Sequence, residues 1–276
     1  MDGKLLERLF ETSDQEAEYA EIVIPRNPIL YVKTRTITSG SLTELECYPV
    51  YCWDYRRKVN KVHPSPEAMR IVNTRNSRKK FERLAECNFK PGRDHFLTLT
   101  YADAAPEDEE TCRRDLRNYL KRVNRARKKA GLDKARCIGV IETGKSGRLH
   151  HHLLIEGGLS RDEMEQLWGH GYANCDRIQQ DRHGLTALTR YMTKCFEGKR
   201  ESGRHRYFYT RNLKQPKITE SKSRISRRQA ERIREDADVQ GEIVLRKIFP
   251  GKAIEELTIR QTDWLPGAYI YARMRS

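Results

Sequence analysis

The spacing of apolar residues predicts three β-strands in the middle of the chain. Residues 95–101 alternate apolar and polar side chains, and residues 137–142 form a run rich in β-branched residues. Residues 149–155 are apolar apart from three consecutive histidines, and the turn before them contains Gly144 and Gly147. Such runs, separated by glycine-bearing turns, are typical of strands and hairpins. We therefore expect the last two runs to pair as a hairpin.

The strand that carries the histidines should divide them between the two faces of a sheet. Because successive residues of a strand point to opposite faces, His150 and His152 share one face and His151 lies on the other. Two residues along a strand span about 6.6 Å, so the two imidazoles can converge on one ion. Glu142, at the end of the partner strand, can add a carboxylate. This donor set suits a catalytic divalent ion better than a closed structural zinc site. The alternative is a metal-free strand whose histidine rings form hydrogen bonds at the edge of the core.

Helical spacing predicts a long helix at residues 109–130 and a shorter one opened by the capping box Ser160-Arg161-Asp162-Glu163. The apolar stripe of the long helix consists of Leu116, Tyr119, Leu120 and Val123. Its outer surface carries Arg113, Arg114, Arg117, Lys121, Arg122, Arg125, Arg127, Lys128 and Lys129. A strand, a helix and then a hairpin predict an α+β fold, in which a central antiparallel, RRM-like sheet is covered by helices.

A second candidate element is the predicted helix at residues 185–198. Leu185, Leu188 and Met192 are spaced as a buried stripe, and Tyr191 lies at the margin of that stripe. Lys194 is three residues further on and so lies beside Tyr191 on the same side. A tyrosine at the edge of a buried face can be held firmly while its hydroxyl reaches a cleft. The alternative is that Tyr191 is a simple packing residue.

The chain divides into a core with an extension on either side. We expect residues 1–89 to form an N-terminal extension with irregular strands and a basic helix, which begins at Ser65-Pro66-Glu67. The basic side of that helix is either a solvated surface or a phosphate-contacting one. Residues 90–215 form the predicted core, and residues 216–276 form a basic C-terminal extension.

Composition points to a polyanionic partner. The 276 residues include 54 Lys+Arg against 39 Asp+Glu, a formal net charge of +15, and such an excess favours nucleic acid before membrane. No apolar run approaches the roughly 18 residues of a membrane span, and we expect no membrane partner. The first residues lack the apolar core of a signal peptide. The odd number of cysteines, seven, is typical of reduced thiols, so we expect a cytoplasmic protein.

Three motifs stand in a fixed order along the predicted core: Phe-Leu-Thr-Leu-Thr at 96–100, His-His-His at 150–152 and Tyr-x-x-Lys at 191–194. Together they resemble the HUH endonucleases, specifically the rolling-circle replication initiators of bacterial plasmids and phages. Val140-Ile141-Glu142, Trp168-Gly169 and Arg211 to Pro216 also look like segments of these replication-associated proteins. The resemblance covers roughly residues 90–215, just under half of the chain.

The resemblance implies a role for each matching residue. His150, His152 and Glu142 would bind Mg²⁺ or Mn²⁺. Tyr191 would be the nucleophile that forms a 5′-phosphotyrosine bond, and Lys194 would be its partner on the helix. Some relatives carry a second tyrosine one turn later, where this chain has Cys195. We therefore expect a nicking and closing reaction that uses a single tyrosine.

The implied substrate is single-stranded or extruded origin DNA, because base pairing would obstruct the attack. The expected phosphate-contacting residues are Lys145, Arg148, Arg190, Arg211 and Lys214. The sequence contains no Gly-x-x-x-x-Gly-Lys-Ser/Thr loop. A host helicase and a host polymerase are therefore the expected partners.

Other functions fit parts of this pattern. An HUH-type transposase shares the histidine and tyrosine motifs and would require paired DNA ends. A conjugative relaxase usually places its tyrosine ahead of the histidines, which disfavours it here. A non-catalytic origin-binding protein would have the fold without the cleavage. A metal-dependent phosphohydrolase would turn over without a covalent protein–DNA adduct.

Overall fold

The computed structural model describes residues 28–52, 65–102, 108–144, 147–179, 181–197, 206–262 and 265–276. Within these residues the fold is α+β with two antiparallel five-stranded sheets, as the sequence predicted. The chain forms two compact units. Unit 1 consists of Met1–Asn73 and Pro216–Ser276, and unit 2 consists of Thr74–Gln215. The predicted core, residues 90–215, lies inside unit 2.

The sheet of unit 2 has the strand order β6-β3-β5-β4-β7, with every neighbouring pair antiparallel. Its strands are β3 (His95–Tyr101), β4 (Cys137–Thr143), β5 (Leu149–Ile155), β6 (Gly171–Arg177) and β7 (Phe208–Tyr209). The three strands predicted from apolar spacing are confirmed, and β4 pairs with β5 as a hairpin. The histidine-bearing strand β5 is the middle strand of the sheet, so its side chains are flanked by neighbours on both sides.

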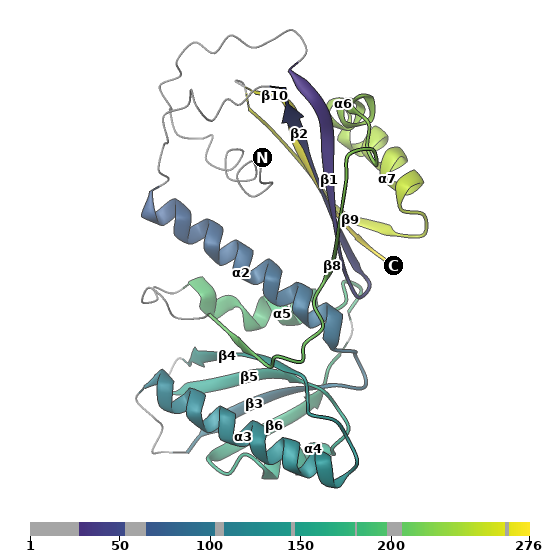
Figure 1. Ribbon diagram of the computed structural model, residues 1–276. Helices are drawn as coiled ribbons and strands as arrows, with labels where there is room; N and C mark the ends of the chain where they lie inside the picture. Colours follow the sequence, from purple (N-terminus) through teal and green to yellow (C-terminus); the bar gives the residue numbers. More distant parts are fainter. Residues whose placement is uncertain are drawn as a thin grey trace. The chain divides into compact units, whose positions relative to one another are not determined.

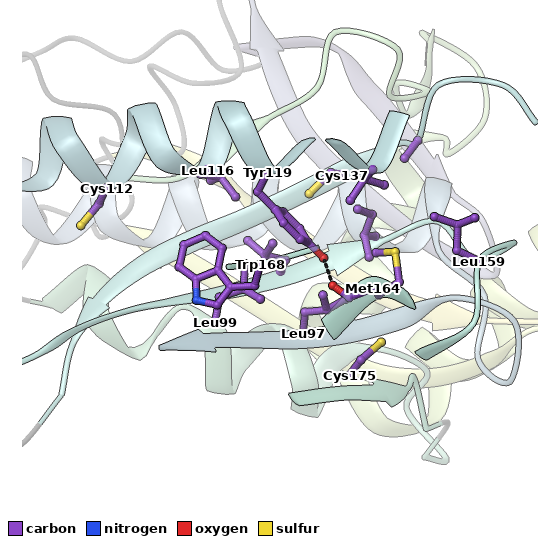
Figure 2. Packing of buried hydrophobic residues seen from close by; sticks show 14 of the residues in the cluster. Leu97, Leu99, Cys112, Leu116, Tyr119, Cys137, Leu159, Met164, Trp168 and Cys175 are labelled. Atoms are coloured by element: carbon purple, nitrogen blue, oxygen red, sulfur yellow. Dashed lines mark hydrogen bonds between the residues drawn. The ribbon is translucent and has the colours of Figure 1, made fainter. Parts of the chain in front are cut away.

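One face of this sheet, here called the α3 face, is covered by α3 (Glu109–Lys129) and α4 (Arg161–Gln166). Figure 2 shows the core on this face, where Tyr119 of α3 donates a hydrogen bond of 3.0 Å to the carbonyl of Met164. The indole of Trp168 is fully buried and donates to the carbonyl of Thr100 at 3.0 Å. The capping box at Ser160 is formed. The apolar stripe of α3 therefore packs as its spacing predicted.

The opposite face, here called the α5 face, is covered by α2 (Pro66–Asn88), α5 (Thr186–Met192) and the 3₁₀ turn η2 (Lys194–Glu197). Residues of α2 from Thr74 onward belong to unit 2. The core on this side contains Phe81, Leu84, Val140, Leu154, Leu185, Met192 and Phe196. The predicted helix at 185–198 is shorter than expected, because the α-helix ends at Met192 and the chain continues as the tighter turn η2.

Unit 1 joins segments from both ends of the chain in one sheet of order β8-β1-β2-β10-β9. Its strands are β1 (Ile29–Ser39), β2 (Leu42–Tyr51), β8 (Lys217–Ser221), β9 (Ala253–Thr262) and β10 (Leu265–Arg275). The helices α6 (Arg227–Glu235) and α7 (Glu242–Ile248), joined by the π-helical turn η3 (Ala237–Gly241), pack on one face through Ile233 and Leu245. No helix in the described ranges is both long and apolar enough to cross a membrane.

Candidate active site

The register of β5 sets the two faces of the candidate site. Thr100 and Glu142 are the cross-strand neighbours of His150, while Thr98 and Val140 are those of His152. Cross-strand neighbours project from the same face, and Val140 belongs to the core on the α5 face. His150, His152 and Glu142 therefore belong to the α5 face, as the alternation predicted.

The middle histidine, His151, serves the opposite face. It is fully buried, and its Nε2 atom lies 3.1 Å from the hydroxyl of Tyr101. That hydroxyl also donates to the carboxylate of Asp115 on α3 at 3.4 Å. Burial lowers the pKa of His151 to about 3, with a further contribution from the neighbouring histidines, so the ring is neutral near pH 7. His151 is a core residue that ties β5 to β3.

Two threonines of β3 hold the rings of the outer histidines. Thr100 Oγ1 lies 3.0 Å from Nδ1 of His150, and Thr98 Oγ1 lies 3.2 Å from Nδ1 of His152. When Nδ1–H donates to the threonine oxygen, the Nε2 atom of each ring carries the free lone pair. Hydroxyls placed in this way behind histidine ligands fix their tautomer and orientation. The Thr-x-Thr alternation in residues 98–100 was visible in the sequence, but its pairing with the histidines was not.

Glu142 and His152 are brought together, since Oε2 of Glu142 lies 3.3 Å from Nε2 of His152. Burial lowers the pKa of His152 and outweighs the raising effect of the Glu142 carboxylate. A lowered pKa keeps His152 neutral near pH 7, which is the form that binds metal. The donor chemistry of this pair suits a divalent ion with open positions.

His150 is held differently, against the backbone of Gly144. A β-carbon built at Gly144 would lie 2.5 Å from Nε2 of His150 and 2.9 Å from its Cδ2 atom, so only glycine leaves room for the ring. Among the residues that the structure describes, no three His, Cys, Asp or Glu side chains are arranged to hold a metal ion. The geometry thus assembles Glu142 with His152 and leaves His150 apart from them.

Tyr191 lies on the same face as these groups. Its ring centroid is 5.6 Å from that of His152, with the two rings inclined at 70°. Phe96 of β3 stacks on His152 at 5.8 Å and contacts Tyr191 edge-on at 6.4 Å. The Tyr191 side of this cluster is open to solvent, because the residue is 45 % exposed. Nζ of Lys194 lies 5.5 Å from the Tyr191 ring centroid.

The position of α5 depends on α2, which the sequence did not indicate. The helix α5 has no side-chain cap of its own at Leu185. Instead, Oε1 of Glu86 accepts a hydrogen bond of 3.0 Å from the Leu185 amide. At the other end, Arg78 donates to the carbonyl of Thr193 at 3.4 Å and to the carboxylate of Glu197 at 2.7 Å. Two charged residues of α2 therefore hold both ends of the segment that carries Tyr191.

The expected phosphate-contacting residues are distributed along the chain around the site. Lys145 lies outside the described residues. Arg148 is exposed just before β5, and Arg190 is exposed in the last turn of α5. Arg211 and Lys214 are exposed in the segment that follows β7. Their contacts with DNA stay a prediction.

The double variant Arg78→Gln/Glu86→Gln should loosen α5 without disturbing the sheet. Each hydrogen bond to a charged group contributes about 1.5–3 kcal/mol when it is shielded from water. Amide hydrogen exchange across residues 185–193, followed by mass spectrometry, should therefore speed up roughly tenfold or more, while exchange in β5 stays unchanged. Lys80→Gln, at an exposed position of the same helix, is the control and should change neither rate. Unaltered exchange in the double variant would contradict this role of α2.

Comparison with known protein families gives a match over residues 94–196 to a family of replication-associated proteins that is named after ORF2. The matched segment runs from the residue before β3 to η2 and contains Glu142, His150, His152, Tyr191 and Lys194. A comparison with curated protein sequences finds no match.

Among solved structures, the chain is similar to the "hypothetical protein ORF119 from Sulfolobus islandicus rod-shaped virus 1". The identity is 16%, the match covers 48% of this chain and 98% of the other, and the TM-score is 0.31. A likeness at this level carries no argument about function. The family match supports a replication-initiator-like protein with a role in DNA replication.

Proposed function

We propose that this protein is a metal-dependent endonuclease that nicks one DNA strand at a replication origin and thereby starts rolling-circle replication of a plasmid or phage. The observation that carries the proposal is the position of Tyr191. Its ring lies 5.6 Å from that of His152 on one face of the sheet, inside the segment that matches the replication-associated family. A nucleophile beside a cluster of histidine and carboxylate groups is the arrangement that phosphodiester transfer requires.

The chemistry assigned to Tyr191 is an in-line displacement at phosphorus. The phenolic oxygen forms a bond to the scissile phosphate, and the bond from phosphorus to the 3′ oxygen of the preceding nucleotide breaks. The phenol loses its proton, and the departing 3′ oxygen gains one. A free phenol has a pKa near 10, and the positive charge of nearby Lys194 favours its anion. The products are a 5′-phosphotyrosine bond and a 3′-OH that a polymerase can extend.

The covalent bond also allows the nick to be closed. The phosphotyrosine bond retains the energy of the phosphodiester, so a 3′-OH that attacks it restores the strand without ATP. Cys195 takes the place in which some relatives carry a second tyrosine. Each transfer is therefore assigned to Tyr191 alone.

Glu142, His150 and His152 are the residues that we propose to hold Mg²⁺ or Mn²⁺. When bound, such an ion neutralises charge on the phosphate oxygens during transfer. The chain's own residues prepare the ligands, since Thr98 and Thr100 orient the rings and burial keeps His152 neutral. The exposed side of Tyr191 leaves room for a single strand, which Arg148 and Arg190 would contact at its phosphates.

One observation favours a second candidate, a non-catalytic origin-binding protein. In the described part of the chain, no three potential ligands are arranged to hold a metal ion, and His150 lies against Gly144. A protein that kept this fold for DNA binding alone would need no such convergence. The two candidates differ in one product, the covalent adduct.

The variant Tyr191→Phe should abolish adduct formation with a single-stranded origin oligonucleotide in Mn²⁺, because it lacks the attacking oxygen. Its affinity for the same oligonucleotide should stay within about twofold, because ring stacking and phosphate contacts are retained. The adduct is measured as a shifted band on a denaturing gel.

The matched control is Tyr172→Phe on β6, which removes the hydroxyl of another exposed tyrosine of unit 2. It should form the adduct at the wild-type rate. An adduct retained by Tyr191→Phe would dismiss Tyr191 as the nucleophile, and the absence of an adduct in the wild-type protein would leave the non-catalytic candidate.

Replacing the two ring-holding hydroxyls should weaken metal binding. The variant Thr98→Val/Thr100→Val keeps the shape of both side chains and removes the partners of Nδ1 on His150 and His152. Loss of such partners typically lowers metal affinity about 10–100-fold. Calorimetric titration with Mn²⁺ measures this, with Thr143→Val at an exposed position of β4 as the control. Equal Mn²⁺ affinity in the variant and in the wild-type protein would contradict the proposed ligands.

A further inference from the structure

The outer surface of α3 carries a row of cations that the candidate active site does not use. The row consists of Arg114, Arg117, Lys121, Arg125 and Lys128, all exposed, and is here called the α3 stripe. Residues spaced three and four apart follow one side of a helix. With a rise of 1.5 Å per residue, the roughly 14 steps from first to last span about 21 Å. The α3 stripe is therefore one straight basic ridge.

The ridge is distinct from the arginines that stabilise the fold. Arg122 donates to the carbonyls of Leu167 and Trp168 at 2.8 and 2.7 Å. Arg127 is buried and donates to the carbonyl of Asp133 at 2.7 Å. Both therefore serve as structural ties within unit 2. The side chains of the α3 stripe face solvent instead.

Acidic residues do not neutralise the ridge. The carboxylate of Glu109 pairs with Arg113 at 2.6 Å. Asp115 is buried beside Tyr101, with Arg114 at 3.6 Å from it. After Asp115, every charged residue of α3 is basic. Like charges at this spacing destabilise a helix, and the helix dipole favours cations only in the last turn. Most of the α3 stripe lies before that turn, so helix stability does not account for it.

The ridge and Tyr191 are separated by the sheet. The apolar side of α3 packs on the α3 face through Leu116 and Tyr119, whereas Tyr191 contacts His152 and Phe96 on the α5 face. Figure 1 shows α3 and α5 on opposite sides of the strands. A strand bound at Tyr191 is thus a different segment of nucleic acid from one bound at the α3 stripe.

The chemistry of the ridge fits a duplex better than a single strand. Proteins that grip single strands without reading sequence stack the bases on exposed aromatic side chains. The one aromatic residue of α3, Tyr119, is fully buried. What the ridge offers is cations at regular intervals, and these match the phosphates of a duplex, which follow each other about every 3.4 Å along each strand. Contacts of this kind position DNA without specifying its sequence.

We propose that the α3 stripe binds the phosphate backbone of double-stranded DNA, independently of sequence, on the face of unit 2 opposite Tyr191. Such a surface would hold the duplex that flanks the strand at the candidate active site. The duplex contact does not depend on cleavage by Tyr191.

The test compares two triple variants of the full chain. In Arg117→Gln/Lys121→Gln/Arg125→Gln, affinity for a blunt duplex of arbitrary sequence should fall at least about tenfold near 0.1 M salt. The slope of log K against log salt should become shallower by about 2.7, since each lost phosphate contact removes about 0.9. Affinity for a single-stranded oligonucleotide should stay within about twofold, because the site at Tyr191 is untouched. Thermal unfolding checks that the fold persists.

The control variant Lys90→Gln/Lys134→Gln/Lys247→Gln removes the same net charge from exposed positions outside α3. It should retain the wild-type salt slope. An equal loss of duplex affinity in both variants, or an unchanged slope in the α3 variant, would overturn the proposal, and an acidic protein would then be the better partner for the ridge. Failure of the wild-type protein to form an adduct would refute cleavage by Tyr191 but leave the duplex result intact.

Discussion

The pairing of β5 between β3 and β4 determines which groups can meet at the candidate site. A shift of one residue in this register would move His150 and His152 to the α3 face and bring His151 to the α5 face. His151 opposes such a shift, because its ring is buried and contacts the Tyr101 hydroxyl of the neighbouring strand β3. Neighbouring histidines thus have opposite functions: one stabilises the register, and the others are displayed by it.

The tyrosine reaches this face through a second set of constraints. The helix α5 is short, and Glu86 and Arg78 of α2 bind the two ends of the segment that contains it. The aromatic contacts of Tyr191 with His152 and Phe96 then link helix and sheet directly. Because the ring is packed on one side and exposed on the other, it is held in place while remaining accessible to a large substrate.

Local patterns predicted the elements of unit 2 well, because each element buries one face. The alternation around Leu97 and Leu153 and the helical stripe of α3 need no knowledge of distant residues. The interactions that the sequence did not indicate are long-range or depend on a side-chain rotamer. They include the pairing of β2 with β10 in unit 1, the bond from Glu86 to the Leu185 amide and the close fit of His150 against Gly144. No local period in the sequence marks such contacts.

The central claim is that the phenolic oxygen of Tyr191 receives the phosphate of the cleaved strand. The most direct measurement is mass spectrometry of peptides from the protein after reaction with single-stranded origin DNA and nuclease digestion. The account predicts a nucleotide 5′-phosphate attached to the peptide that contains Tyr191, with fragmentation that locates it on that residue. A nucleotide on any other residue, or cleaved DNA without a modified peptide, would contradict it.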